Sequence, residues 1–137
     1  MSLLLDTSVL LSLFVEDIHT QQAENIFRSV LAGDEQGYFT TLILVEVCGA
    51  VRRRAGKESA ERALAKLQEW SHQGILELLD HNTEIIQKAC SLAIGYSIKG
   101  ADALIAATTD YHQLQQATFD EEVKERLKSR IEFYSAG

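Results

Sequence analysis

The chain has 137 residues, 46% of them hydrophobic and 24% charged, which is typical of an ordinary globular protein and predicts a single domain over residues 1–137. Its formal net charge of −7 argues against a general nucleic-acid coat protein, although an enzyme that holds cations among carboxylates is compatible with it. No apolar run is long enough to cross a bilayer and no segment resembles a signal peptide, so we expect a cytoplasmic protein that does not bind a membrane.

Along the chain, short apolar segments alternate with segments of helical periodicity. Strands are expected at residues 3–5, 38–40, 75–79, 117–119 and, at an edge of the sheet, 131–134. Helices are expected at residues 8–16, 20–32, 41–55, 57–73, 82–97 and 120–128, with a further helix that starts at Gly100. The alternation predicts an α/β fold in which helices cover both faces of a parallel sheet. Polar residues that follow the strands of such a sheet gather at its carboxyl edge, where ligands bind.

Two acidic residues directly follow predicted strands. Asp6 lies inside the apolar stretch "LLLDTSVLL", and Asp120 follows residues 117–119. If their strands are neighbours, the two carboxylates come close together. Each residue also has a local explanation, because Asp6 can cap the helix that begins near Ser8, and Asp120 can join Glu121 and Glu122 in an acidic first helical turn.

Two further acids lie within apolar helical segments. Glu46 is in "LILVEVCGAV", beside the apolar face of its predicted helix, where the small Gly49 would leave space next to the carboxylate. Asp102 is in the first turn of the helix "GADALIAA". Local explanations again exist, since Glu46 can pair with Arg53 or Lys57 and an acid is favourable at a helix N-terminus.

The four acids are more informative together than singly. Clustered carboxylates repel one another and raise one another's pKa, so a stable cluster calls for a cation. Carboxylates without His or Cys suit hard ions such as Mg²⁺ or Mn²⁺.

The stretches "LLLDTSVLL", "LILVEV", "KGADALIAATT" and "TFDEEV" resemble, in order and approximate spacing, the four acidic motifs of PIN-domain nucleases, especially the VapC-type toxins of toxin–antitoxin pairs. The segment "DYHQLQQATFD" is more polar than the strand usual in that family. The resemblance implies a three-layer α/β/α sandwich around a short, mostly parallel sheet, and a metal-dependent endoribonuclease. It assigns Asp6, Glu46, Asp102 and Asp120 to the acidic site, and it places Thr7 and Thr118 at small-hydroxyl positions beside them.

From the resemblance we expect one or two Mg²⁺ or Mn²⁺ ions, with Asp6 and Asp120 as the preferred direct ligands and Glu46 and Asp102 binding metal or orienting its water. Substrate phosphates need positive charge nearby, for which Arg53 and Lys99 are the candidates. The resemblance also implies an RNA substrate, a homodimer and an antitoxin bound across the N-terminal helices. An apolar stripe there suits either an antitoxin or the core: Leu10, Leu11, Leu13, Phe14, Ile26, Phe27 and Val30.

Two other functions compete with this interpretation. A catalytically inactive PIN-like module would bind RNA or a protein, but its expected mark, the loss of an acid, is not seen. A phosphoacceptor receiver-type domain would use Asp6 and Asp80, but "LLLDTS" lacks the adjacent acidic pair that such a domain normally has.

Overall fold

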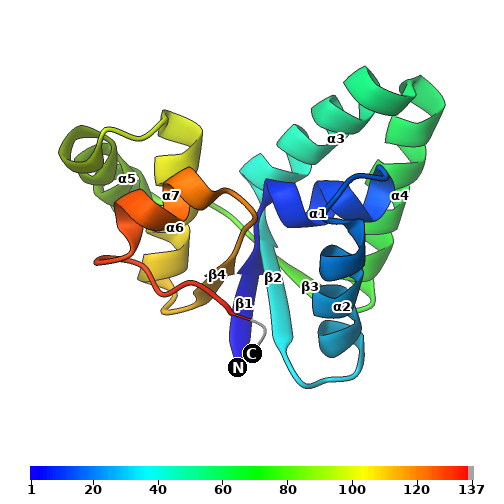
Figure 1. Cartoon of the computed structure of the whole chain (residues 1–137), viewed down its shortest axis with the longest axis horizontal. Helices are drawn as coiled ribbons and strands as arrows, with labels where there is room; N and C mark the ends of the chain where they lie inside the picture. The colour runs from blue at the N-terminus through cyan, green and yellow to red at the C-terminus, as the bar shows by residue number, and fades with distance from the viewer. Residues whose placement is uncertain (136–137) are drawn as a thin grey trace.

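The computed structural model describes residues 1–135, and its centre is a four-stranded sheet (Figure 1). The strands are β1 (Ser2–Leu5), β2 (Gln36–Thr40), β3 (Leu76–Leu79) and β4 (Gln115–Ala117). They lie in the order β3-β2-β1-β4, and every pair is parallel. The predicted α/β class and parallel sheet are therefore confirmed. The carboxyl ends of β1 and β4 are neighbours, as the expected approach of Asp6 and Asp120 requires.

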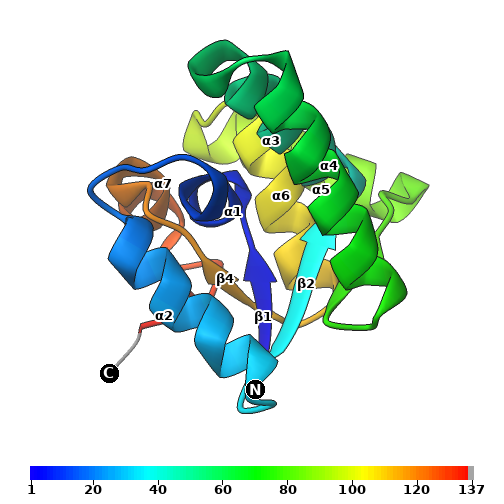
Figure 2. The same cartoon turned by 90° about the vertical axis from the view of Figure 1, so that its right-hand side faces the viewer.

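Helices flank the sheet in two groups, which gives the three layers expected. The helices are α1 (Thr7–Phe14), α2 (Thr20–Leu31), α3 (Thr41–Ala55), α4 (Lys57–His72), α5 (Thr83–Tyr96), α6 (Gly100–Tyr111) and α7 (Glu121–Leu127). Figure 1 shows α1 to α4 on one side and α5 to α7 on the other, and Figure 2 shows α1 and α2 beside β1 from a second direction. Within residues 1–135, no helix combines the length and apolar character needed to span a membrane.

Side-chain caps fix where several helices begin. Asp6 caps α1, Thr40 caps α3, Asn82 caps α5 as predicted, and Asp120 caps α7. Asp6, Thr40 and Asp120 therefore lie where the chain leaves a strand or its following loop and enters a helix. This local geometry brings their side chains to the carboxyl edge of the sheet.

The C-terminal part of the sheet differs from the prediction. Strand β4 ends at Ala117, whereas the sequence placed it at residues 117–119. The polar Gln116 is only 1% exposed, and its Oε1 accepts a hydrogen bond from Thr109 Oγ1 at 3.0 Å, so its amide oxygen is satisfied inside the protein. The strand predicted at residues 131–134 is reduced to one parallel bridge between Gln116 and Phe133.

The apolar stripe of the N-terminal helices belongs largely to the core. Leu10, Ile26, Phe27 and Val30 are buried with the strands and α3 in the main hydrophobic cluster. The remaining members of the stripe are partly buried and pack against that cluster: Leu11, Leu13 and Phe14.

Candidate active site

Asp6 lies at the end of β1 and is the most buried of the four predicted acids. Its side chain is 8% exposed. Oδ1 accepts hydrogen bonds from Ser8 N at 3.0 Å, Ser8 Oγ at 2.6 Å and Val9 N at 3.4 Å. These contacts confirm the capping explanation, and because all three fall on Oδ1, they leave Oδ2 outside the cap.

Ser8 joins the first acid to the segment that carries the fourth. While its hydroxyl donates to Asp6, the same Oγ accepts the backbone N–H of Phe119 at 3.0 Å and lies 3.5 Å from Thr118 Oγ1. The sequence analysis missed Ser8, whose only sequence signal is its position two residues after Asp6. Its role depends on contacts with a segment 110 residues away.

Burial raises the pKa of Asp6 from its ordinary value of 3.8 to about 6. The Ser8 and Thr118 hydroxyls and the N–H groups of Val9 and Ser8 oppose this increase without cancelling it. The folded protein therefore makes ionisation of this carboxyl costly, and a nearby cation would lower that cost.

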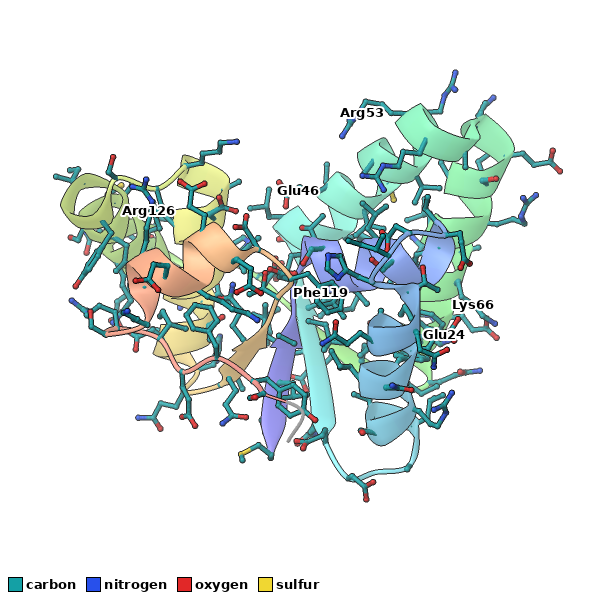
Figure 3. The ribbon with its side chains drawn as sticks, viewed as in Figure 1. Glu24, Glu46, Arg53, Lys66, Phe119 and Arg126 are labelled. Carbon is teal, nitrogen blue, oxygen red and sulfur yellow. The ribbon has the colours of Figure 1, made fainter. Side chains whose placement is uncertain are left out.

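Glu46 is held by Thr7 rather than by a basic residue. Thr7 Oγ1 donates to Glu46 Oε1 at 2.6 Å and so ties the start of α1 to α3. Among the described residues, the ion pairs do not include Glu46, so the alternative explanation, a pairing with Arg53 or Lys57, does not apply. Figure 3 shows Glu46 directed toward the side of the molecule that carries α6 and α7.

Asp102 and Asp120 line one hollow of about 190 Å³. Burial raises the pKa of Asp102, and the negative charges of Asp120, Glu46 and Glu122 raise it further, while Lys99 lowers it. Asp120, Glu46 and Glu122 are therefore each close enough to Asp102 to disfavour its ionised form. Asp120 caps α7, because its Oδ1 accepts Val123 N at 3.1 Å, and Glu121 and Glu122 form the acidic first turn beside it.

Two basic residues line the hollow, one at the start of α6 and one in α7. Lys99 lines it directly. Arg126, which the sequence analysis missed, lines it as well and is held by Glu122 at 3.0 Å and by the carbonyl of Ser97 at 3.2 Å. Its sequence signal was its position one helical turn after Glu122.

Arg53 is exposed and folds back along α3. Its Nη1 lies 3.3 Å from the point where a Cβ on Gly49 would stand. The space beside Gly49 is thus used by Arg53, whereas the sequence analysis assigned it to the Glu46 carboxylate. Figure 3 labels Arg53 on the same helix as Glu46.

Thr118 is 4% exposed, and its Oγ1 accepts the backbone N–H of Asp120 at 3.1 Å. Together with the Thr7–Glu46 hydrogen bond, this contact shows that both predicted hydroxyl positions touch the acidic residues or their backbone. Each hydroxyl restricts the position of an acid that follows or faces it.

The donor set is chemically suited to a hard divalent cation, because it consists of carboxylate oxygens. The negative charges of neighbouring acids disfavour the ionised form of Asp102, and a bound cation would stabilise that form. Within residues 1–135, however, no three His, Cys, Asp or Glu side chains already form a closed set of metal ligands. Of the four predicted acids, only Asp102 and Asp120 line the hollow, so the structure brings these two together with Glu122, while Asp6 and Glu46 are not among the lining residues.

The sequence profile of the PIN domain matches residues 3–127. The chain belongs to the PIN domain family. No curated protein sequence matches this PIN domain. The family assignment contradicts the alternative of a receiver-type domain. Asp80, which that alternative paired with Asp6, follows β3 at one edge of the sheet, and β2 lies between β3 and β1.

Solved structures share the fold of this PIN domain at low sequence identity. VapC20 of Mycobacterium tuberculosis, described as a sarcin-ricin loop cleaving toxin, has a TM-score of 0.75 at 16% identity and covers 94% of this chain and 95% of its own. VapBC-1 of nontypeable Haemophilus influenzae has a TM-score of 0.72 at 15% identity over 98% of both chains. VapBC2 of Rickettsia felis, bound to a promoter DNA fragment, has a TM-score of 0.70 at 18% identity over 96% of this chain and 93% of its own. These likenesses support the three-layer fold.

Proposed function

We propose that this PIN domain is a divalent-metal-dependent endoribonuclease and the toxin of a toxin–antitoxin pair. The observation that supports the proposal is the hollow that Asp102, Asp120 and Glu122 line in a PIN fold, where neighbouring negative charges raise the pKa of Asp102. A similar fold in a toxin described as cleaving the sarcin-ricin loop supports RNA as the substrate class.

Mg²⁺ or Mn²⁺, as one or two ions, would be held by Asp6 and Asp120, with Glu46 and Asp102 as further ligands or as acceptors that orient a water. When bound, such an ion makes a water easier to deprotonate and offsets charge on the phosphate and the leaving oxygen. Asp6 would bind the ion through Oδ2, because the capping hydrogen bonds all fall on Oδ1. Two of those bonds come from Ser8, which thereby holds the carboxylate in place.

The remaining residues position the acids and the substrate. Thr7 holds Glu46 at 2.6 Å, and Thr118 holds the backbone that leads into Asp120. Lys99 at the hollow and Arg53 on α3 would contact RNA phosphates, which need positive charge on a protein of net charge −7.

The partners of this chain are also part of the proposal. Solved complexes of similar fold are described as toxin–antitoxin assemblies, which supports a cognate antitoxin. A hollow of about 440 Å³ between the end of α1 and α4, lined by Phe14, Ala63 and Lys66 among others, gives an antitoxin segment a place beside the N-terminal helices. A homodimer is proposed on the family resemblance, and light scattering on the purified chain would test it.

The decisive experiment is cleavage of a panel of RNAs with Mg²⁺, Mn²⁺ or EDTA. Wild type is compared with Asp6→Asn, Asp102→Asn and Asp34→Asn, the last being an exposed carboxylate that serves as control. Loss of an acid should lower cleavage about 100-fold or more, because an ion contributes several kcal/mol to the transition state. The control should cleave like wild type.

Two results would contradict the proposal. The first is cleavage that persists in EDTA, and the second is unchanged activity in both acid variants. An inactive RNA- or protein-binding module predicts a third pattern, in which the wild type binds RNA but shows no metal-dependent turnover.

A further inference from the structure

A second hollow, of about 320 Å³, lies between α2, the segment that follows β4 and the C-terminal segment. It is bounded by Gln22 and Ile26 of α2, by Thr118 and Phe119 after β4, and by Lys124 and Tyr134. Figure 3 shows Phe119 near the carboxyl ends of β1 and β2, beside α1 and α2.

Its lining combines flat apolar surfaces with polar groups. Phe119 and Tyr134 bring aromatic rings, and His19 stacks on Phe119 with ring centroids 4.5 Å apart and planes 14° from parallel. Gln22 is exposed and Tyr134 is partly buried, and both side chains border the hollow. An amide and a phenol can donate to and accept from the polar edge of a flat heterocycle.

Thr118 is shared between this hollow and the acidic site. It lines the hollow, while its Oγ1 accepts Asp120 N at 3.1 Å and lies 3.5 Å from the Ser8 hydroxyl that holds Asp6. A nucleotide whose base enters the hollow would therefore have its phosphate close to the carboxylates. Lys124 lines the same hollow and pairs with Glu121 at a long distance of 3.5 Å. Its positive charge would face the phosphate backbone of such a nucleotide.

We propose that this hollow is a nucleobase subsite, which binds an unpaired base of single-stranded RNA next to the phosphodiester to be cut. The proposal rests on the proposed ribonuclease function and names its substrate more closely. Unstacked bases of RNA loops are bound between aromatic side chains and read along their edges, whereas bases inside a duplex do not reach such a hollow. Gln22 and Tyr134 then determine which base is preferred.

The test measures base preference without turnover. Anisotropy gives the Kd of labelled A, C and U octaribonucleotides in EDTA, for wild type, Gln22→Ala and Tyr134→Phe. Gln21→Ala, one position earlier on α2, and Tyr111→Phe, at the end of α6, are the matched controls. The ratio of the weakest to the tightest Kd among the three octamers should fall about three- to tenfold in the two hollow variants, as expected for one lost hydrogen bond. In the controls this ratio should stay within about twofold of the wild-type ratio.

A wild type that binds the three octamers equally, or that binds none, would overturn the subsite, as would hollow variants whose ratio stays within twofold of wild type. These outcomes differ from failure of the nuclease proposal, which is measured separately as absent metal-dependent cleavage. Base preference in EDTA that responds to Gln22 and Tyr134 would uphold base binding in this hollow, and it does so independently of the cleavage assay that tests the nuclease proposal.

Discussion

Replacing Asp6 with asparagine should stabilise the metal-free protein at neutral pH even though it removes a proposed catalytic group. Burial raises the pKa of Asp6 from 3.8 to about 6, so between these two values the folded protein holds a proton that the unfolded chain has lost. The free energy of unfolding therefore falls as pH rises through this window, and the loss is complete above about pH 7. A difference of about two pKa units corresponds to roughly 3 kcal/mol.

An asparagine at position 6 carries no charge, and its Oδ1 can still accept from Ser8 and Val9. We expect Asp6→Asn to unfold at higher urea concentration than wild type at pH 7.5 in EDTA, by up to about 3 kcal/mol. The advantage should shrink toward zero as pH falls to 4. Asp34→Asn, at an exposed loop position, should show no such dependence on pH.

The refuting result is a stability difference between Asp6→Asn and wild type that does not change between pH 4 and pH 7.5, or that changes in the opposite direction. Either outcome would mean that the folded protein does not disfavour the ionised carboxylate. If Mg²⁺ binds at Asp6, its addition at pH 7.5 should stabilise wild type more than the variant, because the variant lacks one of the four proposed carboxylate ligands.

Three further predictions concern packing and hydrogen bonding, each measured by urea unfolding. Thr7→Val should lower the free energy of unfolding by about 1 kcal/mol, because it removes the 2.6 Å hydrogen bond to Glu46; an unchanged value would mean that water replaces the hydroxyl fully. Gly37→Ala should cost about 1–3 kcal/mol, since its Cβ would stand 2.6 Å from Leu76 Cδ2, and a neutral effect would show that Leu76 moves freely. Gly95→Ala, in α5 with no atom within 4 Å of the new Cβ, should stabilise by about 0.5–1 kcal/mol; destabilisation would contradict an unstrained helical position.

The sequence predicted the helices well because their boundaries depend on nearby residues. The helix expected at residues 41–55 is observed as Thr41–Ala55, and Asn82 caps α5 because its Oδ1 accepts the N–H of Ile85, three residues later. Periodicity and capping act over one or two turns, so they can be read without knowing the fold.

Strand β4 was displaced by two residues in the prediction for the opposite reason. Its sequence, "QQA", is polar, and nothing local indicates that Gln116 would be buried. Burial is possible because Thr109 of α6 donates a hydrogen bond to its side chain, and that contact exists only after α6 packs beside the strand. The sequence therefore predicted that Asp120 follows this strand, but it did not predict how far Asp120 lies from the end of β4.

The same distinction applies to the candidate site. Apolar surroundings singled out the four acids in the sequence. Ser8 and Arg126 stand near acids in the sequence, but a serine or an arginine near an acid is common and does not by itself indicate a role. Ser8 gains its place through Phe119 and Thr118, and Arg126 gains its place through the carbonyl of Ser97, 29 residues earlier. Residues whose role consists of long-range contacts emerge only from the folded structure.

The central position of β1 has a consequence for how the acidic edge is assembled during folding. The Phe119 amide that anchors Asp6 through Ser8 is 111 residues away from Ser8, and the parallel neighbour β4 is separated from β1 by a similar length of chain. The helices can form from nearby residues, whereas the carboxylate edge is incomplete until these two distant segments have paired.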